Sequence, residues 1–335
     1  MKMGLAGLGR IGKIHLQNLQ NNSAVTEISV CVPSENSREY ARKRGIKRLY
    51  ANFDQMLEQE ELDAVCISSP SDTHLEFAHK AVDKGLQVFC EKPLDFSVKA
   101  MEDLQQKVKE KGIRFMVGFN KRFDPEFMKA KNLLKEGKIG SLQLVSIKSV
   151  DPAPPPVSYI TTSGGLYMDM VIHDFDMARF MVEAEVESVY ASGNALADPA
   201  IASAGDISVS QCILNFQNGV VVSILNSRKS GYGYDQRLEM WGSKGLLGVQ
   251  NPPRNHIELW LGEEKTIAGS MDFFLERFRK AYEIELNAFI LSLVEESSIP
   301  VSIHDAIQAT AIALAAQKSM EEDRKVTLEE IYSSF

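Results

Sequence analysis

Short apolar runs alternate with segments of helical period along the first third of the chain. The runs predict strands at Met3–Ala6, Ile28–Val32, Ala64–Ser68, Gln87–Cys90 and Arg114–Val117, and the segments between them predict helices near 11–20, 37–45, 52–60, 73–84 and 97–111. Gly85 and Gly112 stand where glycines commonly end a helix. Strict alternation of strands and helices favours parallel strands joined by right-handed crossovers. We therefore expect an α/β fold with a doubly wound parallel sheet.

After Phe119 the apolar positions form longer runs that roughly alternate with polar positions. These runs predict strands at Leu142–Val150, Ile207–Phe216, Val220–Ser227, Arg237–Trp241 and His256–Leu261. Asn218-Gly219 lies between two of them and is a strong hairpin signal. A helix is expected near 173–182, and long helices near 272–296 and 303–321. The pattern predicts an α+β domain with an open, mostly antiparallel sheet.

The length of the chain favours two domains. At 335 residues it is long for a single hydrophobic core. Because the pattern changes near Gly118, we expect residues 1–118 to form one domain and residues 119–335 the other. The last helices are expected to pack back on the first domain.

Charge and hydropathy argue against two kinds of partner. The net charge is −8 and the densest cationic run, 42–44, has only three residues, so nucleic acid is not expected. No apolar run approaches the roughly 18 to 20 residues that span a bilayer. The apolar opening, 1–12, is too short and too broken by glycine and arginine for a signal peptide. The four cysteines lack CxxC spacing and three lie in the core strands predicted in the first third of the chain, so we expect buried thiols in the cytoplasm.

A glycine-rich turn joins the first predicted strand to the first predicted helix. Its sequence, Gly7-Leu8-Gly9-Arg10-Ile11-Gly12, has the GxGxxG spacing. The glycines permit a tight turn and close approach of the backbone to a pyrophosphate, and the helix start presents free N–H groups to it. In this strand–turn–helix context the motif predicts a Rossmann domain that binds a dinucleotide through Gly7, Gly9, Arg10 and Ile11.

The residue expected to contact the adenosine ribose departs from the usual pattern. NAD sites commonly place Asp or Glu at the end of the second strand, and Ser34 stands there in this chain. Ser34 can donate to a 2′-phosphate and Arg38 follows one turn later, whereas Glu35 would disfavour a phosphate and could reach the 2′-hydroxyl. Ser34 could instead cap the following helix. We expect NAD as the cofactor, with NADP possible.

Two further strand ends contribute to the same predicted crevice, because ligands bind beyond the carboxyl ends of parallel strands. Ser69, Pro70 and His74 follow the third predicted strand, and Glu91-Lys92-Pro93 follows the fourth. A charged pair that ends an apolar strand needs a reason, although a surface turn is the simpler alternative. We expect these residues to contact the dinucleotide.

Five longer motifs lie along the chain: Glu91-Lys92-Pro93, GFNKRFDP at 118–125, SGGLYMDMVIHDFDMAR at 163–179, YGYDQR at 232–237 and GSKG at 242–245. Together they resemble the Gfo/Idh/MocA oxidoreductases, and within that family the branch of inositol 2-dehydrogenases. The resemblance covers essentially the whole chain. It implies an NAD(P)-dependent dehydrogenase that oxidises a secondary hydroxyl of a cyclic polyol, with myo-inositol the leading substrate. Alternatives are scyllo-inositol, a related sugar or, more distantly, a ligand-sensing regulator that has lost catalysis.

The resemblance also implies catalytic roles for Lys92, Asp169 and His173, and a cis Lys92–Pro93 bond. Removal of hydride from a carbinol needs a base for the hydroxyl proton, and a histidine oriented by a carboxylate suits that task near neutral pH. If 169–179 is helical, Asp169 and His173 lie on one face. Asp176 is an alternative carboxylate partner, and packing at the helix start is the alternative role of His173. Lys92 would hold the substrate oxygen.

Polyol recognition implies several polar side chains in one pocket. By the same resemblance, the substrate-contacting positions besides the catalytic three are Arg122, Asp151, Tyr159 and Tyr232. Arg122 could instead pair with Asp124, and Tyr232 could be a hairpin aromatic. The remaining histidines, His15, His79, His256 and His304, are expected at surface or hydrogen-bonded positions. No group of residues has trustworthy metal-ligand spacing, so no metal is expected.

The open sheet bears on assembly. A sheet with one uncovered face tends to be buried by another subunit, and family members of this kind are commonly tetramers. We therefore expect a homo-oligomer, a tetramer or a dimer.

Overall fold

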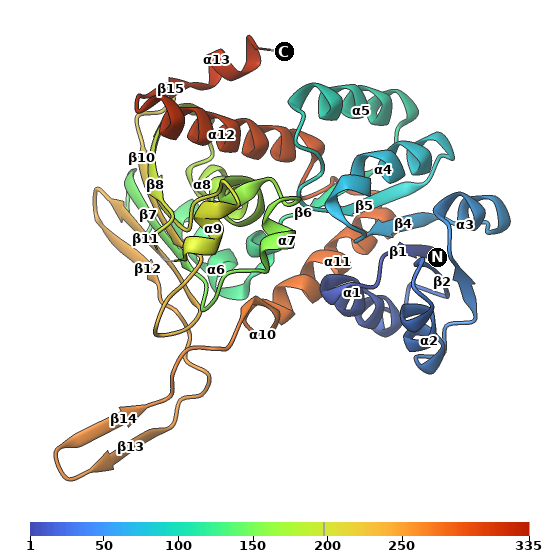
Figure 1. The fold of residues 1–335 in the computed structure, drawn as a ribbon, viewed down its shortest axis with the longest axis horizontal. Helices are drawn as coiled ribbons and strands as arrows, with labels where there is room; N and C mark the ends of the chain where they lie inside the picture. Colours follow the sequence, from blue (N-terminus) through green and yellow to red (C-terminus); the bar gives the residue numbers. More distant parts are fainter. Residues whose placement is uncertain (197, 335) are drawn as a thin grey trace. The chain divides into compact units, whose positions relative to one another are not determined.

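A computed structural model describes residues 1–196 and 198–334. It divides into two compact units (Figure 1). The first unit comprises Met1–Phe123 and Lys280–Thr310, and the second comprises Asp124–Arg279 and Ala311–Phe335.

The first unit is built on a six-stranded parallel sheet of order β3-β2-β1-β4-β5-β6. Its strands are β1 (Lys2–Ala6), β2 (Glu27–Cys31), β3 (Arg48–Tyr50), β4 (Ala64–Ile67), β5 (Gln87–Glu91) and β6 (Phe115–Gly118). Strands β4, β5 and β6 are buried on both faces, as expected of a parallel sheet. The predicted doubly wound α/β fold is confirmed. Strand β3 was not predicted, because three partly exposed residues carry no readable period.

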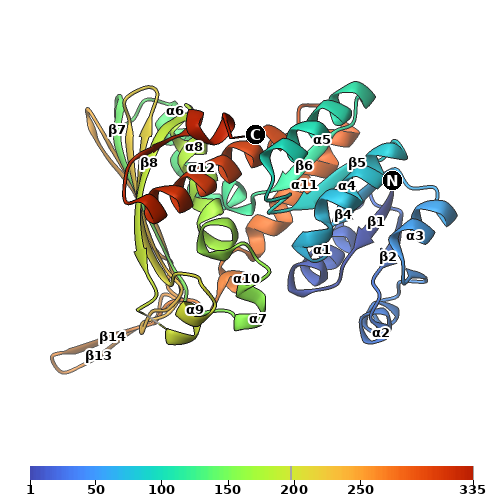
Figure 2. The same cartoon turned by 45° about the horizontal axis from the view of Figure 1, so that its top comes forward.

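Helices cover the first sheet in two groups (Figure 2). The helices are α1 (Arg10–Asn21), α2 (Glu35–Lys43), α3 (Phe53–Gln59), α4 (His74–Asp83), α5 (Val98–Lys111) and α11 (Arg279–Val294), with 3-10 turns η1 (Ser71–Thr73) and η2 (Asn120–Phe123). Helix α4 contacts both α3 and α5. Helix α11 packs beside α1, where the ring of Tyr282 meets His15 edge-on, and its Phe289 contacts Phe89 of β5. Residues from the far end of the chain therefore complete the core of the first unit.

Local signals set the ends of several helices, and the two C-terminal glycines among them were predicted. Gly85 and Gly112 follow α4 and α5 with φ of 79° and 65°, a left-handed conformation that favours glycine. At the start of α5 the side chain of Ser97 accepts a hydrogen bond from the N–H of Ala100, and Asn52 caps α3 in the same way.

The second unit is built on a seven-stranded sheet of order β12-β11-β7-β10-β9-β8-β15. Its strands are β7 (Leu142–Val150), β8 (Val186–Asn194), β9 (Val209–Phe216), β10 (Val221–Ser227), β11 (Asp235–Gly242), β12 (Gly245–Val249) and β15 (Val326–Thr327). Only β7 and β10 pair in parallel, which confirms a mostly antiparallel sheet. The predicted hairpin at Asn218-Gly219 joins β9 to β10, with Gly219 at φ 85°.

Three expectations for this half of the chain were wrong or incomplete. The run at His256–Leu261 does not join the large sheet: β13 (Glu258–Leu261) pairs only with β14 (Glu264–Ile267), in an exposed arm visible in Figure 1. The helix expected at 272–296 is broken into α10 (Phe274–Arg277) and α11. Strand β8 was missed because a register shift after Val186 interrupts its alternation.

Helices lie on one face of the second sheet, and none of those described covers the other face (Figure 2). The remaining elements are α6 (Pro125–Lys135), α7 (Val157–Ile160), η3 (Tyr167–Val171), α8 (Ile172–Val182), α9 (Pro199–Ser203), α12 (Ile303–Glu322) and α13 (Leu328–Tyr332). Burial alternates along β8, β9 and β10, as expected of a sheet covered on one face. The uncovered face carries exposed apolar side chains, namely Leu144, Tyr190, Ile213, Leu225 and Leu246.

Two predictions on composition can be compared with the structure directly. All four cysteines are free and buried, as predicted. Among the described residues, no helix combines the length and the hydropathy that crossing a membrane requires.

Candidate active site

The glycine turn before α1 has the geometry that a dinucleotide phosphate needs. Gly7 has φ 94°, and a Cβ there would lie 2.5 Å from the carbonyl oxygen of Ser68. A Cβ on Gly12 would lie 2.3 Å from the carbonyl oxygen of Gly7, so the packing of α1 on β1 requires glycine. At Gly9, by contrast, no atom lies within 4 Å of the Cβ position, and α1 has no acidic residue in its first turn. The turn thus leaves space beside Gly9 for a pyrophosphate at the helix start.

The contrast between Gly9 and Gly12 gives a paired prediction. Gly9→Ala should leave the free energy of unfolding within about 1 kcal/mol of the native value. It should weaken NADH binding at least about tenfold, because the added methyl group would occupy the space expected for the phosphate. Gly12→Ala should itself destabilise the protein by about 1–3 kcal/mol through overpacking. Thermal unfolding and NADH fluorescence titration measure the two effects, and unchanged NADH affinity in Gly9→Ala would contradict the assignment.

The structure engages Arg38 with its own neighbours. Its guanidinium donates to the Glu35 carboxylate at 2.6 and 3.0 Å and to the carbonyl oxygens of Val32 and Pro33 at 2.8 and 2.7 Å. Hydrogen bonds from Arg42 and Arg38 lower the pKa of Glu35. Ser34 occupies the N-cap position of α2, but its side chain makes no capping hydrogen bond. The charge of Arg38 is therefore largely matched by Glu35, which favours a ribose hydroxyl over a 2′-phosphate.

We expect kcat/KM to favour NAD over NADP, with NADP tolerated because Ser34 does not repel its phosphate. Ser34→Asp should raise the NAD-to-NADP ratio at least about tenfold, because the new carboxylate repels the 2′-phosphate and accepts from the ribose. Asn21→Asp, which adds the same charge at the far end of α1, is the control and should leave the ratio unchanged. A native preference for NADP above about tenfold, some 1.4 kcal/mol, would contradict the expectation.

His74 ties together the loops that follow β4 and β5. Its Nε2 lies 2.9 Å from the carbonyl oxygen of Ser69 and its Nδ1 lies 2.7 Å from that of Pro93. Burial lowers the pKa of His74, and a neutral ring donates to one of these carbonyls at a time. Ser69 is held further by a 2.6 Å contact between its hydroxyl and that of Thr73, and Pro70 beside it is exposed. We infer that His74 shapes both loops from within the core.

Glu91, which ends β5, is also buried. Its carboxylate lies 2.6 Å from Nε2 of His15, a fully buried residue of the dinucleotide helix α1. The next bond, Lys92–Pro93, is cis, as the resemblance implied. Glu91 therefore links α1 to the turn that presents Lys92, while Lys92 itself is partly exposed. Sequence reasoning gave His15 no such role, because its partner lies 76 positions away.

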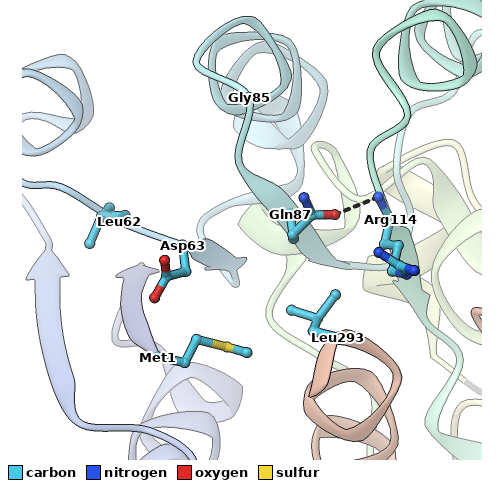
Figure 3. A pocket seen from close by; sticks show the side chains of 7 residues that line it. All are labelled: Met1, Leu62, Asp63, Gly85, Gln87, Arg114 and Leu293. Carbon is cyan, nitrogen blue, oxygen red and sulfur yellow. Dashed lines mark hydrogen bonds between the residues drawn. The ribbon is translucent and has the colours of Figure 1, made fainter. Parts of the chain in front are cut away.

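A hollow in the first unit lies at the amino-terminal ends of the parallel strands, opposite the ends that the glycine turn and Lys92 follow (Figure 3). Its lining residues are Met1, Leu62, Asp63, Gly85, Gln87, Arg114 and Leu293. All but Leu293 precede or begin a strand, whereas the glycine turn and Lys92 follow strands. Because dinucleotides bind at the carboxyl ends of parallel strands, this hollow is not the cofactor site.

Asp169 and His173 belong to the second unit, on consecutive helical segments. Asp169 lies in the π-helical turn η3, and His173 lies in the first turn of α8. The α-helical spacing assumed for the two residues is therefore wrong in detail, because a π turn holds more residues than an α turn. Asp169 Oδ1 accepts a hydrogen bond from the hydroxyl of Tyr159 at 2.9 Å, and Oδ2 accepts from Arg228 at 3.2 Å.

The carboxylate next to His173 anchors α8 to the sheet. Asp174 is fully buried and accepts hydrogen bonds from Ser149 of β7 at 2.8 Å and from Asn226 of β10 at 2.7 Å. Asp176, the alternative partner considered for His173, is also buried. Asp174 and Arg228 were missed by sequence reasoning. For Arg228 the available signal was the polar Asn-Ser-Arg sequence at 226–228, where β10 ends.

The other predicted substrate residues have these surroundings. Arg122, in the first unit, donates to Asp305 at 2.9 Å. Asp124, the partner considered for Arg122 in the alternative, caps α6 and pairs with Arg277. Tyr232 is exposed, and its hydroxyl lies 2.9 Å from the carboxylate of Asp235.

Asp151 directly follows β7, and its backbone N–H donates to the carbonyl oxygen of Ser227 at 2.8 Å. In the part of the chain that the structure describes, no three His, Cys, Asp or Glu residues are grouped so that they could hold a metal ion.

The parallel sheet, its glycine turn and the polar residues after β4 and β5 define a dinucleotide-dependent oxidoreductase of the Rossmann class. Comparison with known proteins identifies the family. Residues 1–119 match the model described as an oxidoreductase family with an NAD-binding Rossmann fold, and residues 127–248 match the GFO/IDH/MocA C-terminal domain. The chain belongs to the GFO/IDH/MocA oxidoreductase family, and NAD is its cofactor.

Individual relatives agree over nearly the full chain. The chain is 39% identical to the myo-inositol 2-dehydrogenase of Thermotoga maritima over 99% of both proteins. It is 37% identical to the inositol 2-dehydrogenase of Rhizobium meliloti, over 98% of this chain and 99% of that one. The crystal structure of scyllo-inositol dehydrogenase from Lactobacillus casei with bound NAD(H) and scyllo-inositol superposes with a TM-score of 0.92 at 31% identity, covering 98% of this chain and 99% of the other.

Proposed function

We propose that this protein oxidises one secondary hydroxyl of a cyclic polyol, with myo-inositol its leading substrate. The names of the relatives support this substrate class. The observation that carries the proposal is the fixed carboxylate of Asp169, which Tyr159 and Arg228 hold directly before the helix that carries His173. A carboxylate ahead of a histidine is an arrangement suited to proton removal from a hydroxyl.

Three side chains divide the chemistry. His173 accepts the hydroxyl proton, and Asp169 orients the ring and stabilises the imidazolium. Lys92 donates to the substrate oxygen and stabilises the negative charge that develops there. NAD supplies the hydride acceptor. Asp169 is preferred over Asp176 as the orienting group because Asp169 is partly exposed, whereas Asp176 is buried.

The residues proposed to contact the ring hydroxyls are Arg122, Asp151, Tyr159 and Tyr232. Hydrogen bonding to several hydroxyls gives stereoisomer selectivity, because a site built for one hydroxyl pattern leaves buried polar groups unpaired with another. Tyr159 already donates to Asp169, so its hydroxyl serves the catalytic carboxylate as well as the substrate.

Initial rates of NAD reduction on a panel of cyclic polyols and sugars test the proposal. Myo-inositol is expected to give the highest kcat/KM, with scyllo-inositol the nearest rival. Equal and barely detectable rates on every polyol would contradict the proposed substrate class, and a higher kcat/KM for a hexose would transfer the same chemistry to a sugar.

We also propose that the chain assembles into a homo-oligomer, a tetramer or a dimer. The uncovered face of the second sheet supports this, because it presents large apolar side chains that include Leu144, Ile213 and Leu225. The arm formed by β13 and β14 adds exposed Leu259 and Trp260. Light scattering measures the particle mass, and a mass of one chain would contradict the proposal.

A further inference from the structure

Arg228 is a buried arginine at the end of β10. Its side chain is only 1% exposed, and its backbone N–H donates to the carbonyl oxygen of Ser208 at 2.8 Å. One terminal nitrogen lies 3.2 Å from Oδ2 of Asp169, and the other lies 3.4 Å from Oδ2 of Asp206. The guanidinium therefore spans two carboxylates that are 37 positions apart in the chain.

Asp206 ties this arginine to the glycine turn ahead of Asp169. Its Oδ1 accepts the backbone N–H of Leu166 at 3.0 Å. A Cβ on Gly165, which has φ 79°, would lie only 2.9 Å from the same oxygen. The 163–166 turn and Arg228 are thus fixed to one carboxylate, and the π-helical turn of Asp169 begins directly after that turn.

The same strand end also holds the other side of His173. Asn226 and Arg228 are two positions apart, so in an extended chain their side chains point to one face. Asn226 donates to Asp174 and Arg228 donates to Asp169, the carboxylates that lie one position after and four positions before His173. A charge as buried as Arg228 is retained only where it is paired and hydrogen-bonded, and a guanidinium holds its partners in a rigid, directional fork.

We propose that Arg228, itself held by Asp206, is a positioning residue for catalysis: it keeps the Asp169 carboxylate ionised and in one orientation. The inference deepens the proposed function and rests on the role given there to Asp169. With Tyr159 on Oδ1 and Arg228 on Oδ2, both oxygens of Asp169 are held before substrate binds.

Arg228→Met tests the proposal against a matched control. We expect kcat on the best polyol to fall about 10- to 100-fold, because a misplacement near 1 Å of a catalytic group costs up to about 10²-fold. NADH affinity should stay unchanged. The acid limb of kcat/KM against pH should move to higher pH, because a guanidinium favours the ionised form of a neighbouring carboxylate. Arg228→Lys keeps a charge and should recover part of kcat.

The control is Arg179→Met. Arg179 is likewise a buried arginine, on α8, and it pairs with Glu185 at 2.7 Å. Its loss should lower the melting temperature as the loss of Arg228 does, but leave kcat and the pH profile within about twofold of the native protein. A merely structural role of Arg228 predicts that the two variants behave alike.

Asp206→Asn supplies a second route that preserves shape. Asp206→Asn should lower kcat by less than Arg228→Met does. The double variant, Asp206→Asn with Arg228→Met, should have a kcat only slightly below that of Arg228→Met alone, because the effects of residues that act as a unit are not additive. A native kcat and a native pH profile in folded Arg228→Met, together with the same result in folded Arg228→Lys or Asp206→Asn, would overturn the inference. If His173→Ala were inactive at the same time, the proposed function would still stand. Full activity of His173→Ala would overturn the proposed function as well.

Discussion

His173→Ala is expected to lower kcat on the best polyol at least about 10²-fold, as loss of a general base does. NADH affinity should stay nearly native, because the glycine turn that we expect to bind the pyrophosphate belongs to the other unit. Steady-state rates over a range of polyol concentrations and an NADH fluorescence titration measure the two quantities. Because the base acts in the transition state, kcat and kcat/KM should fall together.

A matched substitution separates this effect from general damage. His256 is an exposed histidine in the same unit, so His256→Ala should keep its kcat. A His173→Ala variant that retained most of the native kcat would remove His173 from the mechanism.

Lys92→Ala is expected to be as damaging as His173→Ala. Lys92 follows β5 in a turn that the buried Glu91–His15 pair holds, and an ammonium group there can stabilise negative charge on the reacting oxygen. Rates on the best polyol measure the loss, and Lys99→Ala, which removes an exposed lysine paired with Asp103, is the control and should behave as the native protein.

The double variant tests whether the two residues serve one step. If Lys92 and His173 act on the same hydroxyl, Lys92→Ala combined with His173→Ala should be little worse than either change alone. Losses that multiply would show that the two residues serve separate steps.

Much of the fold could be predicted because its signals are local. The alternation of apolar runs and helical segments identified five of the six parallel strands, and the left-handed glycines after α4 and α5 ended their helices. Asn218-Gly219 placed the hairpin between β9 and β10 for the same reason. The predictions failed where a local pattern was absent or ambiguous, as in the three-residue β3 and in His256–Leu261, whose apolar side chains form an exposed arm.

The candidate site could be predicted only in part from the sequence. The glycine turn and the residues that follow β4 and β5 were visible in the sequence, because glycine spacing and polar strand ends are local features. The side chains that hold these segments in place could not be predicted from the sequence. Helix α1 contacts Glu91 through His15. His74 contacts the backbone carbonyls of Ser69 and Pro93, and because every residue has a backbone carbonyl, the residue types at those two positions could not predict these contacts.

The sequence by itself determined the parallel first sheet, the hairpin and the glycine turn, because each depends on neighbours within a few positions. The residues proposed for catalysis came from the family resemblance of longer motifs. Only the tertiary structure decided which distant groups meet. The order of strands in the second sheet places the end of β10 against Asp169 and Asp174, and no local period encodes that order. The tertiary structure also decided that Asp169 lies in a π-helical turn. A buried charge must find partners wherever the fold brings them, so Arg228 could be assigned only when the sheet around it was known.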